Sequence, residues 1–172
     1  MPHVSTGALF RAAVAAGTEV GRRVQAYLER GDLVPDDIVA AIVRHEVLEA
    51  VRDFGGYLLD GYPRTLAQAQ GAHAIALDFG IAAHAAVTFD VPREVLLERL
   101  LGRGTQDGRT DDAATVIRHR LDVYDAETAP LLDYYAERGV LVRVDGNRPV
   151  AEVSAACIAA LHAAMAVAPS PP

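Results

Sequence analysis

The sequence predicts an α/β fold in which helices cover both faces of a parallel sheet. Short apolar runs typical of buried strands alternate with longer segments of helical periodicity. One of these runs, residues 56–60, is a short apolar run that ends in a carboxylate, which is consistent with a buried parallel strand. The 172 residues contain no internal repeat, low-complexity tract or clear linker, and this length suits one compact domain.

The first third of the chain is predicted to be helical. Helices are expected over residues 8–16 and 18–30, and a third begins at Pro35. Thr18 is a preferred N-cap, and Gly31 is a preferred residue after a helix end. The third helix carries one apolar stripe, made of Ile38, Ile42, Val43, Val47 and Val51. The chain is therefore expected to open on a helix rather than on a strand.

The remaining residues alternate strands and helices. Three strands are expected, over residues 56–60, 85–91 and 140–144. The helices are expected to begin at Thr65, at Pro92, at about Ala113 with a break at Pro130, and at Pro149. Residues 102–112 are rich in Gly, Asp and Thr without an apolar period, which predicts a loop. Three short strands would make a thin sheet.

Composition excludes several function classes. The chain has 16 Lys+Arg against 23 Asp+Glu, a formal net charge of -7, which disfavours broad binding to nucleic acid or to an anionic membrane. No apolar run approaches the length of about 18 residues that spans a membrane, and residues 1–20 lack the order of a signal peptide. The single cysteine, Cys157, cannot form an internal disulfide. A cytoplasmic protein is expected.

The strand-to-helix turn after residue 60 is the first candidate site. Asp60 ends a predicted strand, where a carboxylate can hold hydrated Mg²⁺. Arg64, four residues later, can grip a phosphate with two parallel hydrogen bonds. An ordinary turn with a solvated ion pair explains the same residues equally well.

A set of arginines is the second candidate. Phosphoryl transfer needs pre-placed cations, and the candidates are Arg11, Arg64, Arg99, Arg103, Arg109, Arg118 and Arg120. Arg118 and Arg120 are two residues apart on a helix and cannot share a face, so Arg120 is taken as the functional one. A salt-bridged helix surface is the alternative for any single member. The six histidines show no zinc-ligand spacing.

Together these segments resemble the adenylate kinase family of nucleoside monophosphate kinases, over the chain to about residue 165. The most specific string is Leu58-Leu59-Asp60-Gly61-Tyr62-Pro63-Arg64-Thr65, with tyrosine where the family usually has phenylalanine. Further matching strings follow the family's order, at residues 4–11, 31–36, 89–92, 109–112, 117–121 and 144–150. The resemblance implies a transferase of nucleotide biosynthesis that converts ATP and AMP into two ADP, with Mg²⁺ bound alongside ATP.

The resemblance also implies roles for particular residues. The residues matched to the AMP site are Thr6, Arg11, Leu33, Val34, Gly61, Arg64 and Gln68. Within that set, Arg64 is matched to the residue that holds the AMP phosphate and Gln68 to the one that reads the adenine amino group. The residues matched to catalysis are Arg64, Arg103, Arg109 and Arg120, and those matched to ATP are Arg99, Arg103 and Arg148. Asp60 is matched to the carboxylate that holds Mg²⁺ through water.

The implied architecture is one P-loop NTPase-like domain over residues 1–172, with three α/β/α layers. An AMP-binding helical insertion is expected at about 5–34, and a short lid without structural zinc at about 102–112. Members of the family are monomers that bind AMP, ATP and ADP, with no nucleic acid or membrane partner.

Two departures from the family bear on catalysis. The chain has no G-x-x-x-x-G-K-[ST] loop and no lysine, so the family's first strand and P-loop are expected to be missing from these residues. The neighbours of that central strand would then lack a partner, which invites self-association. Ala8 replaces an aspartate that helps Asp60 order the Mg²⁺ water shell. Little activity is expected from the chain by itself.

Two alternatives remain open. A degenerate, catalytically weak AMP-binding protein is favoured by Ala8, because that substitution lies inside the retained part of the chain. A UMP/CMP kinase is the second alternative. Thr65 and Gln68 argue against it, since pyrimidine kinases carry asparagine after the arginine.

Overall fold

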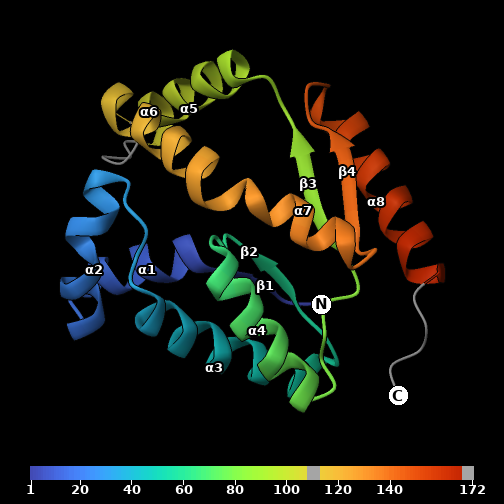
Figure 1. The fold of residues 1–172 in the computed structure, drawn as a ribbon. Coiled ribbons are helices and arrows are strands. Elements are labelled where there is room, and N and C mark those ends of the chain that lie inside the picture. The colour runs from blue at the N-terminus through green and yellow to red at the C-terminus, as the bar shows by residue number, and fades with distance from the viewer. Residues whose placement is uncertain (108–112, 168–172) are drawn as a thin grey trace.

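The computed structural model describes residues 1–107 and 113–167 and shows a mixed α/β fold (Figure 1). Its strands are β1 (His3–Ser5), β2 (Leu58–Asp60), β3 (Ala86–Asp90) and β4 (Leu141–Asp145). Its helices are α1 (Thr6–Ala15), α2 (Glu19–Arg30), α3 (Asp36–Phe54), α4 (Leu66–Asp78), α5 (Arg93–Asp107), α6 (Ala114–Val123), α7 (Pro130–Glu137) and α8 (Val150–Val167). One π-helical turn, η2 (Tyr124–Thr128), joins α6 to α7.

The strands form two separate parallel pairs within the described residues. β1 pairs with β2, placing Val4 opposite Leu59, and β3 pairs with β4, placing Thr88 opposite Arg143. The prediction of a single three-stranded sheet in a chain that opens on a helix is therefore wrong. β1 has only three residues, too few to show a period, and its partner lies more than fifty residues away. In the described chain β2 pairs with β1 alone and β3 pairs with β4 alone.

Local capping signals set the boundaries of α2 and α3. The Thr18 hydroxyl accepts a hydrogen bond from the backbone N–H of Gly21 at 3.0 Å, which satisfies a helix donor that would otherwise lack a partner. Gly31 ends α2 with φ of 76° and Gly55 ends α3 with φ of 71°, a backbone region that glycine enters without penalty. These features confirm the predicted cap at Thr18 and the predicted end at Gly31.

The main core lies among α1, α2 and α3. Its buried side chains are Phe10, Val24, Val34, Ile38, Val39, Val43 and Val47. The predicted stripe of α3 faces this core, with Ile42 and Val51 packed partly buried at its margin. Helices α1 and α2 cross closely at Gly21, where an added Cβ would lie 2.1 Å from the Ala13 carbonyl oxygen. Only glycine permits that approach.

Residues 102–107 are helical, so the prediction of a loop from residue 102 is wrong there. Helix α5 continues to Asp107. Each interior glycine costs a helix only about 1 kcal/mol relative to alanine, so Gly102 and Gly104 did not end this helix. The rest of the expected loop, residues 108–112, lies outside the described residues.

The predicted break at Pro130 takes the form of the wider turn η2. The Ala129 N–H donates to the Tyr124 carbonyl five residues back at 2.8 Å, and Pro130 is the first residue of α7. Proline has no N–H to continue the α-helical ladder and its ring displaces the carbonyl four residues earlier, which explains the change of geometry here.

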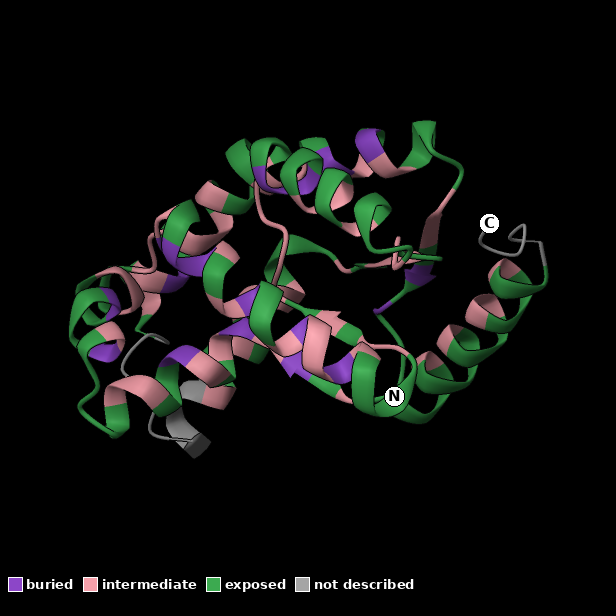
Figure 2. Ribbon diagram, turned by 90° about the horizontal axis from the view of Figure 1, so that it is seen from below, coloured by how far each residue is buried: buried purple, intermediate pink, exposed green. Residues whose placement is uncertain are grey.

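Helix α8 packs on β4 along one stripe and exposes the rest (Figure 2). Its residues between 150 and 166 include none that is buried, and Ile158 is 56% exposed. No helix in the described part of the chain is both long and apolar enough to cross a membrane.

Candidate functional site

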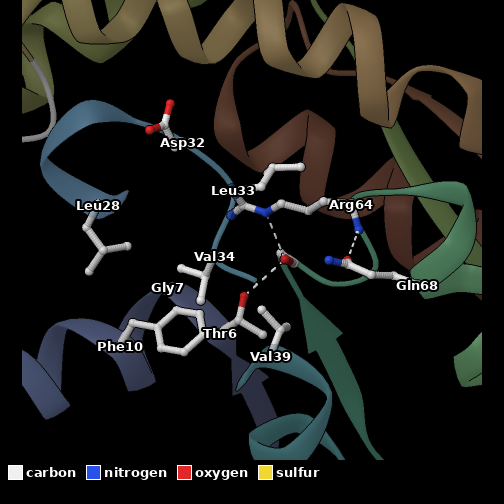
Figure 3. A pocket seen from close by; sticks show the side chains of 11 residues that line it. Thr6, Gly7, Phe10, Leu28, Asp32, Leu33, Val34, Val39, Arg64 and Gln68 are labelled. Carbon is white, nitrogen blue, oxygen red and sulfur yellow. Dashed lines mark hydrogen bonds between the residues drawn. The ribbon is translucent and has the colours of Figure 1, made fainter. Parts of the chain in front are cut away.

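An open pocket lies between α1, the segment after α2, and the turn that joins β2 to α4 (Figure 3). Its lining residues are Thr6, Gly7, Phe10, Leu28, Asp32, Leu33, Val34, Val39, Gly61, Arg64 and Gln68. They include every residue that the sequence matched to an AMP site except Arg11. The guanidinium of Arg11 lies beside the pocket, 3.1 Å from where a Cβ on Gly7 would be.

The carbonyl of Gly61 fixes the centre of the pocket. The Thr6 hydroxyl donates to it at 3.0 Å, and the Nε of Arg64 donates to it at 2.8 Å. Gly61 has φ of 76°, and a Cβ there would lie 2.8 Å from the Thr6 hydroxyl oxygen and 3.0 Å from an Arg64 terminal nitrogen. Glycine is therefore required on both conformational and steric grounds. Thr6, on the first turn of α1, is 3% exposed, so this contact is shielded from water.

Gln68 ties the Arg64 turn to α3. Its side chain is buried, and its carbonyl oxygen accepts a hydrogen bond from the Arg64 backbone N–H at 2.8 Å. Its amide nitrogen donates to an Asp36 carboxylate oxygen at 2.6 Å. Both ends of a buried amide are thus satisfied, and the turn is held against the N-terminus of α3.

Arg64 lines the pocket from the turn before α4, and two further arginines lie near it from other elements, Arg11 from α1 and Arg120 from α6. Burial lowers the pKa of Arg64, and the nearby positive charges of Arg120 and Arg11 lower it further, while Asp60 opposes the shift. A partly buried cation destabilised by two like charges is stabilised by a bound anion. The arrangement suits a phosphate group.

The residues matched to ATP lie in the other half of the chain. Arg99 Nη1 donates to the carbonyl of Gly146 at 2.9 Å, and Arg148 pairs with the Asp145 carboxylate at 2.8 Å. Arg103 follows Arg99 by one turn of α5, and Arg109 lies outside the described residues. Arg99, Arg103 and Arg148 do not line the pocket in the described structure.

Asp60, the candidate magnesium residue, ends β2 with an exposed carboxylate. It accepts a hydrogen bond from the Ser5 hydroxyl at 3.2 Å and lies 3.4 Å from the His3 Nε2. Across the part of the chain that the structure describes, no group of three or more His, Cys, Asp or Glu side chains could hold a metal ion. One accessible carboxylate beside a hydroxyl fits Mg²⁺ bound through water, since this ion takes most of its ligands from water and phosphate.

Sequence reasoning missed a contact that joins the pocket to α6. Asp32 lines the pocket, and its carboxylate lies 2.8 Å from His119 Nε2 and 2.7 Å from Arg30 Nε. The hydrogen bonds from Arg30 and then His119 lower the pKa of Asp32. Next to it, a Cβ on Gly31 would lie only 2.6 Å from Arg120 Cγ. No local pattern reveals a contact between residues 87 positions apart.

Comparison with known proteins gives the same family as the sequence strings. The family model described as adenylate kinase matches residues 1–140. An adenylate kinase of Thermobifida fusca is 44% identical over 161 residues, which cover 94% of this chain and 85% of that protein. An adenylate kinase of Kocuria rhizophila is 44% identical over 166 residues, with 94% and 86% covered. Adenylate kinase 1 of Synechocystis is 42% identical over 154 residues, with 90% and 80% covered. The chain belongs to the adenylate kinase family.

Proposed function

We propose that this chain binds AMP in the pocket described above and acts in phosphoryl transfer between ATP and AMP. The observation that carries the proposal is the gathering of Arg11, Arg64 and Arg120 beside a pocket that is otherwise largely apolar. The positive charges would meet the phosphate, and the apolar wall formed by Leu33, Val34 and their neighbours would take the purine.

Within this proposal, each pocket residue has a distinct task. Arg64 and Arg11 hold the AMP phosphate, and Thr6 with Gly61 keeps Arg64 aimed at it. Gln68 reads the adenine amino group. In the structure its amide is bonded to the Arg64 backbone N–H and to Asp36, so adenine would have to replace or share one of those bonds.

The transfer step requires positive charge on the ATP side as well. Arg103, Arg109 and Arg120 would stabilise the transferring phosphoryl group, while Arg99 and Arg148 would bind ATP. Mg²⁺ held through water beside Asp60 would neutralise phosphate charge. The 172 residues contain no lysine and no G-x-x-x-x-G-K-[ST] loop, so they do not supply the cradle of N–H groups that binds ATP phosphates in P-loop enzymes.

The proposal extends to the architecture. One P-loop NTPase-like domain of three layers would carry the AMP-binding helices at about 5–34 and a short lid at about 102–112, and would act as a monomer in the cytoplasm. The paired strands β1–β2 and β3–β4 support this topology, because one further strand between β2 and β3 would join them into one sheet.

An AMP-binding protein with little catalysis is the second candidate. Ala8 favours it, because the position has no carboxylate to assist Asp60. Both candidates share the AMP site and differ in phosphoryl transfer alone.

Calorimetric titration with AMP, ATP, UMP and CMP in the presence of Mg²⁺ tests the shared part. AMP is expected to bind most tightly, because the groups proposed to bind it are present and the ATP phosphate loop is not. Equal or stronger binding of ATP would contradict the AMP assignment. Preference for UMP or CMP would reassign the pocket to a pyrimidine nucleotide.

A further inference from the structure

Thr128 contacts the pocket from an element that does not line it. Its hydroxyl donates a hydrogen bond to the backbone carbonyl of Arg64 at 2.8 Å, across 64 positions in sequence. Thr128 is the last residue of the π-helical turn η2, between α6 and α7. A side chain from a distant helix therefore holds the main chain of the residue proposed to bind phosphate.

This bond completes the restraint of Arg64. The backbone N–H of Arg64 is held by Gln68 and its Nε is held by the Gly61 carbonyl, each at 2.8 Å. The Thr128 hydroxyl holds the remaining polar group of its main chain, the carbonyl, and the two terminal guanidinium nitrogens are left to face a ligand. With these three bonds in place, neither the peptide after Arg64 nor the side chain can turn without breaking a contact. A cation pre-set in this way loses little entropy when it binds an anion.

The π-turn explains how Thr128 reaches this position. Successive residues of an α-helix are rotated by about 100°, so residues 120 and 128 of a regular helix would point about 80° apart. The π-helical turn contains one more residue than an α-helical turn, which reduces the accumulated rotation between residues 120 and 128 by about 100°. The two side chains are then about 20° apart and lie on one face. In agreement, Arg120 lies near enough to Arg64 to lower its pKa, while Thr128 bonds to the carbonyl of Arg64.

We infer that Thr128 is a positioning residue for Arg64: its hydroxyl keeps the guanidinium aimed at the phosphate of the bound nucleotide. The inference rests on the proposed function, in which Arg64 binds the AMP phosphate. Thr128 itself does not line the pocket. Its contribution to AMP binding therefore passes entirely through Arg64.

The test compares variants by AMP titration. Thr128→Val keeps the shape of the side chain and removes the hydroxyl, and it is expected to weaken AMP binding about three- to tenfold, the loss of one hydrogen bond. Thr128→Ser restores the hydroxyl and is expected to bind AMP within about twofold of the unmodified chain. Thr115→Val makes the same chemical change at an exposed threonine of α6 and should leave AMP affinity unaltered. Thermal melting establishes that each variant is folded.

A double-mutant cycle separates positioning from general destabilisation. In an Arg64→Ala background, Thr128→Val is expected to change AMP affinity by less than about twofold, because the group it positions is gone. An equal loss in both backgrounds would overturn the inference, as would normal AMP affinity in folded Thr128→Val or failure of Thr128→Ser to restore binding. If Arg64→Ala itself leaves AMP affinity unchanged, the proposed function fails, and the inference fails with it.

Discussion

The pocket-forming half of the chain, β1 to α4, and the half that carries β3, α5, β4 and α8 bury their apolar side chains very differently. The first half contains the cluster of Phe10, Val24, Ile38 and their neighbours, packed among three helices. Among the described residues of β3, α5, β4 and α8, Val144 alone belongs to the buried apolar core, whereas exposed apolar side chains occur in both halves, for example Phe54 in the first and Ile158 in the second. Because apolar burial is the main stabilising term, the first half is expected to carry most of the folding free energy.

Exposed ion pairs occur in both halves, such as that of Arg52 with Asp53, but Arg64 is held differently. Arg64 in the first half is bonded to the main chain around it and lies near two other cations. In the second half, Arg143 and Arg148 pair with Asp90 and Asp145 at the surface, where ion pairs contribute little. Arg64 on the proposed AMP side is therefore preorganised by hydrogen bonds within the described chain, including one from Thr128. The proposed ATP side lacks the P-loop donors that bind ATP phosphates, since the 172 residues contain no G-x-x-x-x-G-K-[ST] loop.

The largest effect is expected in catalysis. The 172 residues by themselves should form little ADP from ATP and AMP, because each phosphate-cradle donor is worth about 3–4 kcal/mol. Fusion of a family-type strand, P-loop and helix to the N-terminus should raise turnover toward about 10 per second, an ordinary enzyme rate. A coupled ADP assay measures both proteins, with Arg109→Ala as the control for a contaminating kinase. If the 172 residues alone show such turnover and Arg109→Ala abolishes it, the proposed ATP side is as complete as the proposed AMP side, and the comparison fails.

A pair of identical substitutions tests the packing difference. Ile38→Ala in α3, where Ile38 is 8% exposed, is expected to lower the free energy of unfolding by about 2–5 kcal/mol. Ile158→Ala in α8, where Ile158 is 56% exposed, should change it by less than about 0.5 kcal/mol. Urea unfolding followed by circular dichroism gives both values. Similar losses at the two sites would mean that α8 is buried in solution, for example by self-association.

Arg64→Ala tests the electrostatic difference. The substitution is expected to weaken AMP binding by about 1.5–3 kcal/mol, the range for a charge-assisted hydrogen bond. Arg143→Ala, which removes a paired surface arginine of the other half, should leave AMP affinity unchanged. Calorimetric titration of both variants with AMP measures the two affinities. An unchanged affinity in Arg64→Ala would reduce Arg64 to a turn residue.

The smallest effect concerns acid stability. Folding lowers the pKa of Asp32 below its ordinary value of 3.8, through Arg30 and then His119. The unfolded chain therefore binds the proton more readily, so this stabilisation is present above about pH 4 and disappears as pH falls through the lowered pKa. Asp32→Asn should destabilise the protein slightly at pH 6 and by less at pH 2.5. Urea midpoints at both pH values test this, with Asp37→Asn as the exposed control. A loss of the same size at both pH values would contradict the expected linkage.

The features that could be predicted from the sequence depend on residues that lie near each other in the chain. The caps at Thr18 and Gly31 and the apolar stripe of α3 depend on local geometry, and the structure confirms them. The pocket residues of the Asp60–Thr65 turn and of residues 31–36 were found through family strings. That they lie around one pocket is new from the structure, while their roles remain proposals.

What the sequence could not predict depends on distant pairing. β1 becomes a strand only because His3–Ser5 lies beside Leu58–Asp60, and no three-residue pattern carries that information. The Asp32–His119 and Thr128–Arg64 contacts likewise join residues far apart in the chain. The sequence predicted a loop from residue 102, whereas α5 continues to Asp107. The high local glycine content was taken as a sign of a loop, although each glycine destabilises a helix only slightly.

The close approach of Gly31 to α6 fixes how far the segment after α2, which lines the pocket, lies from Arg120 and Val116. A methyl group at residue 31 would overlap Arg120 Cγ and press on Val116, whose Cγ1 would lie 3.0 Å away. The segment after α2 would then have to stand off from α6. Asp32, the next residue, would be drawn from His119, and Arg120 would move relative to Arg64. Gly31→Ala is therefore expected to hold the segment after α2 away from α6 and so to widen the pocket. A crystal structure of this variant would show the pocket in that wider form.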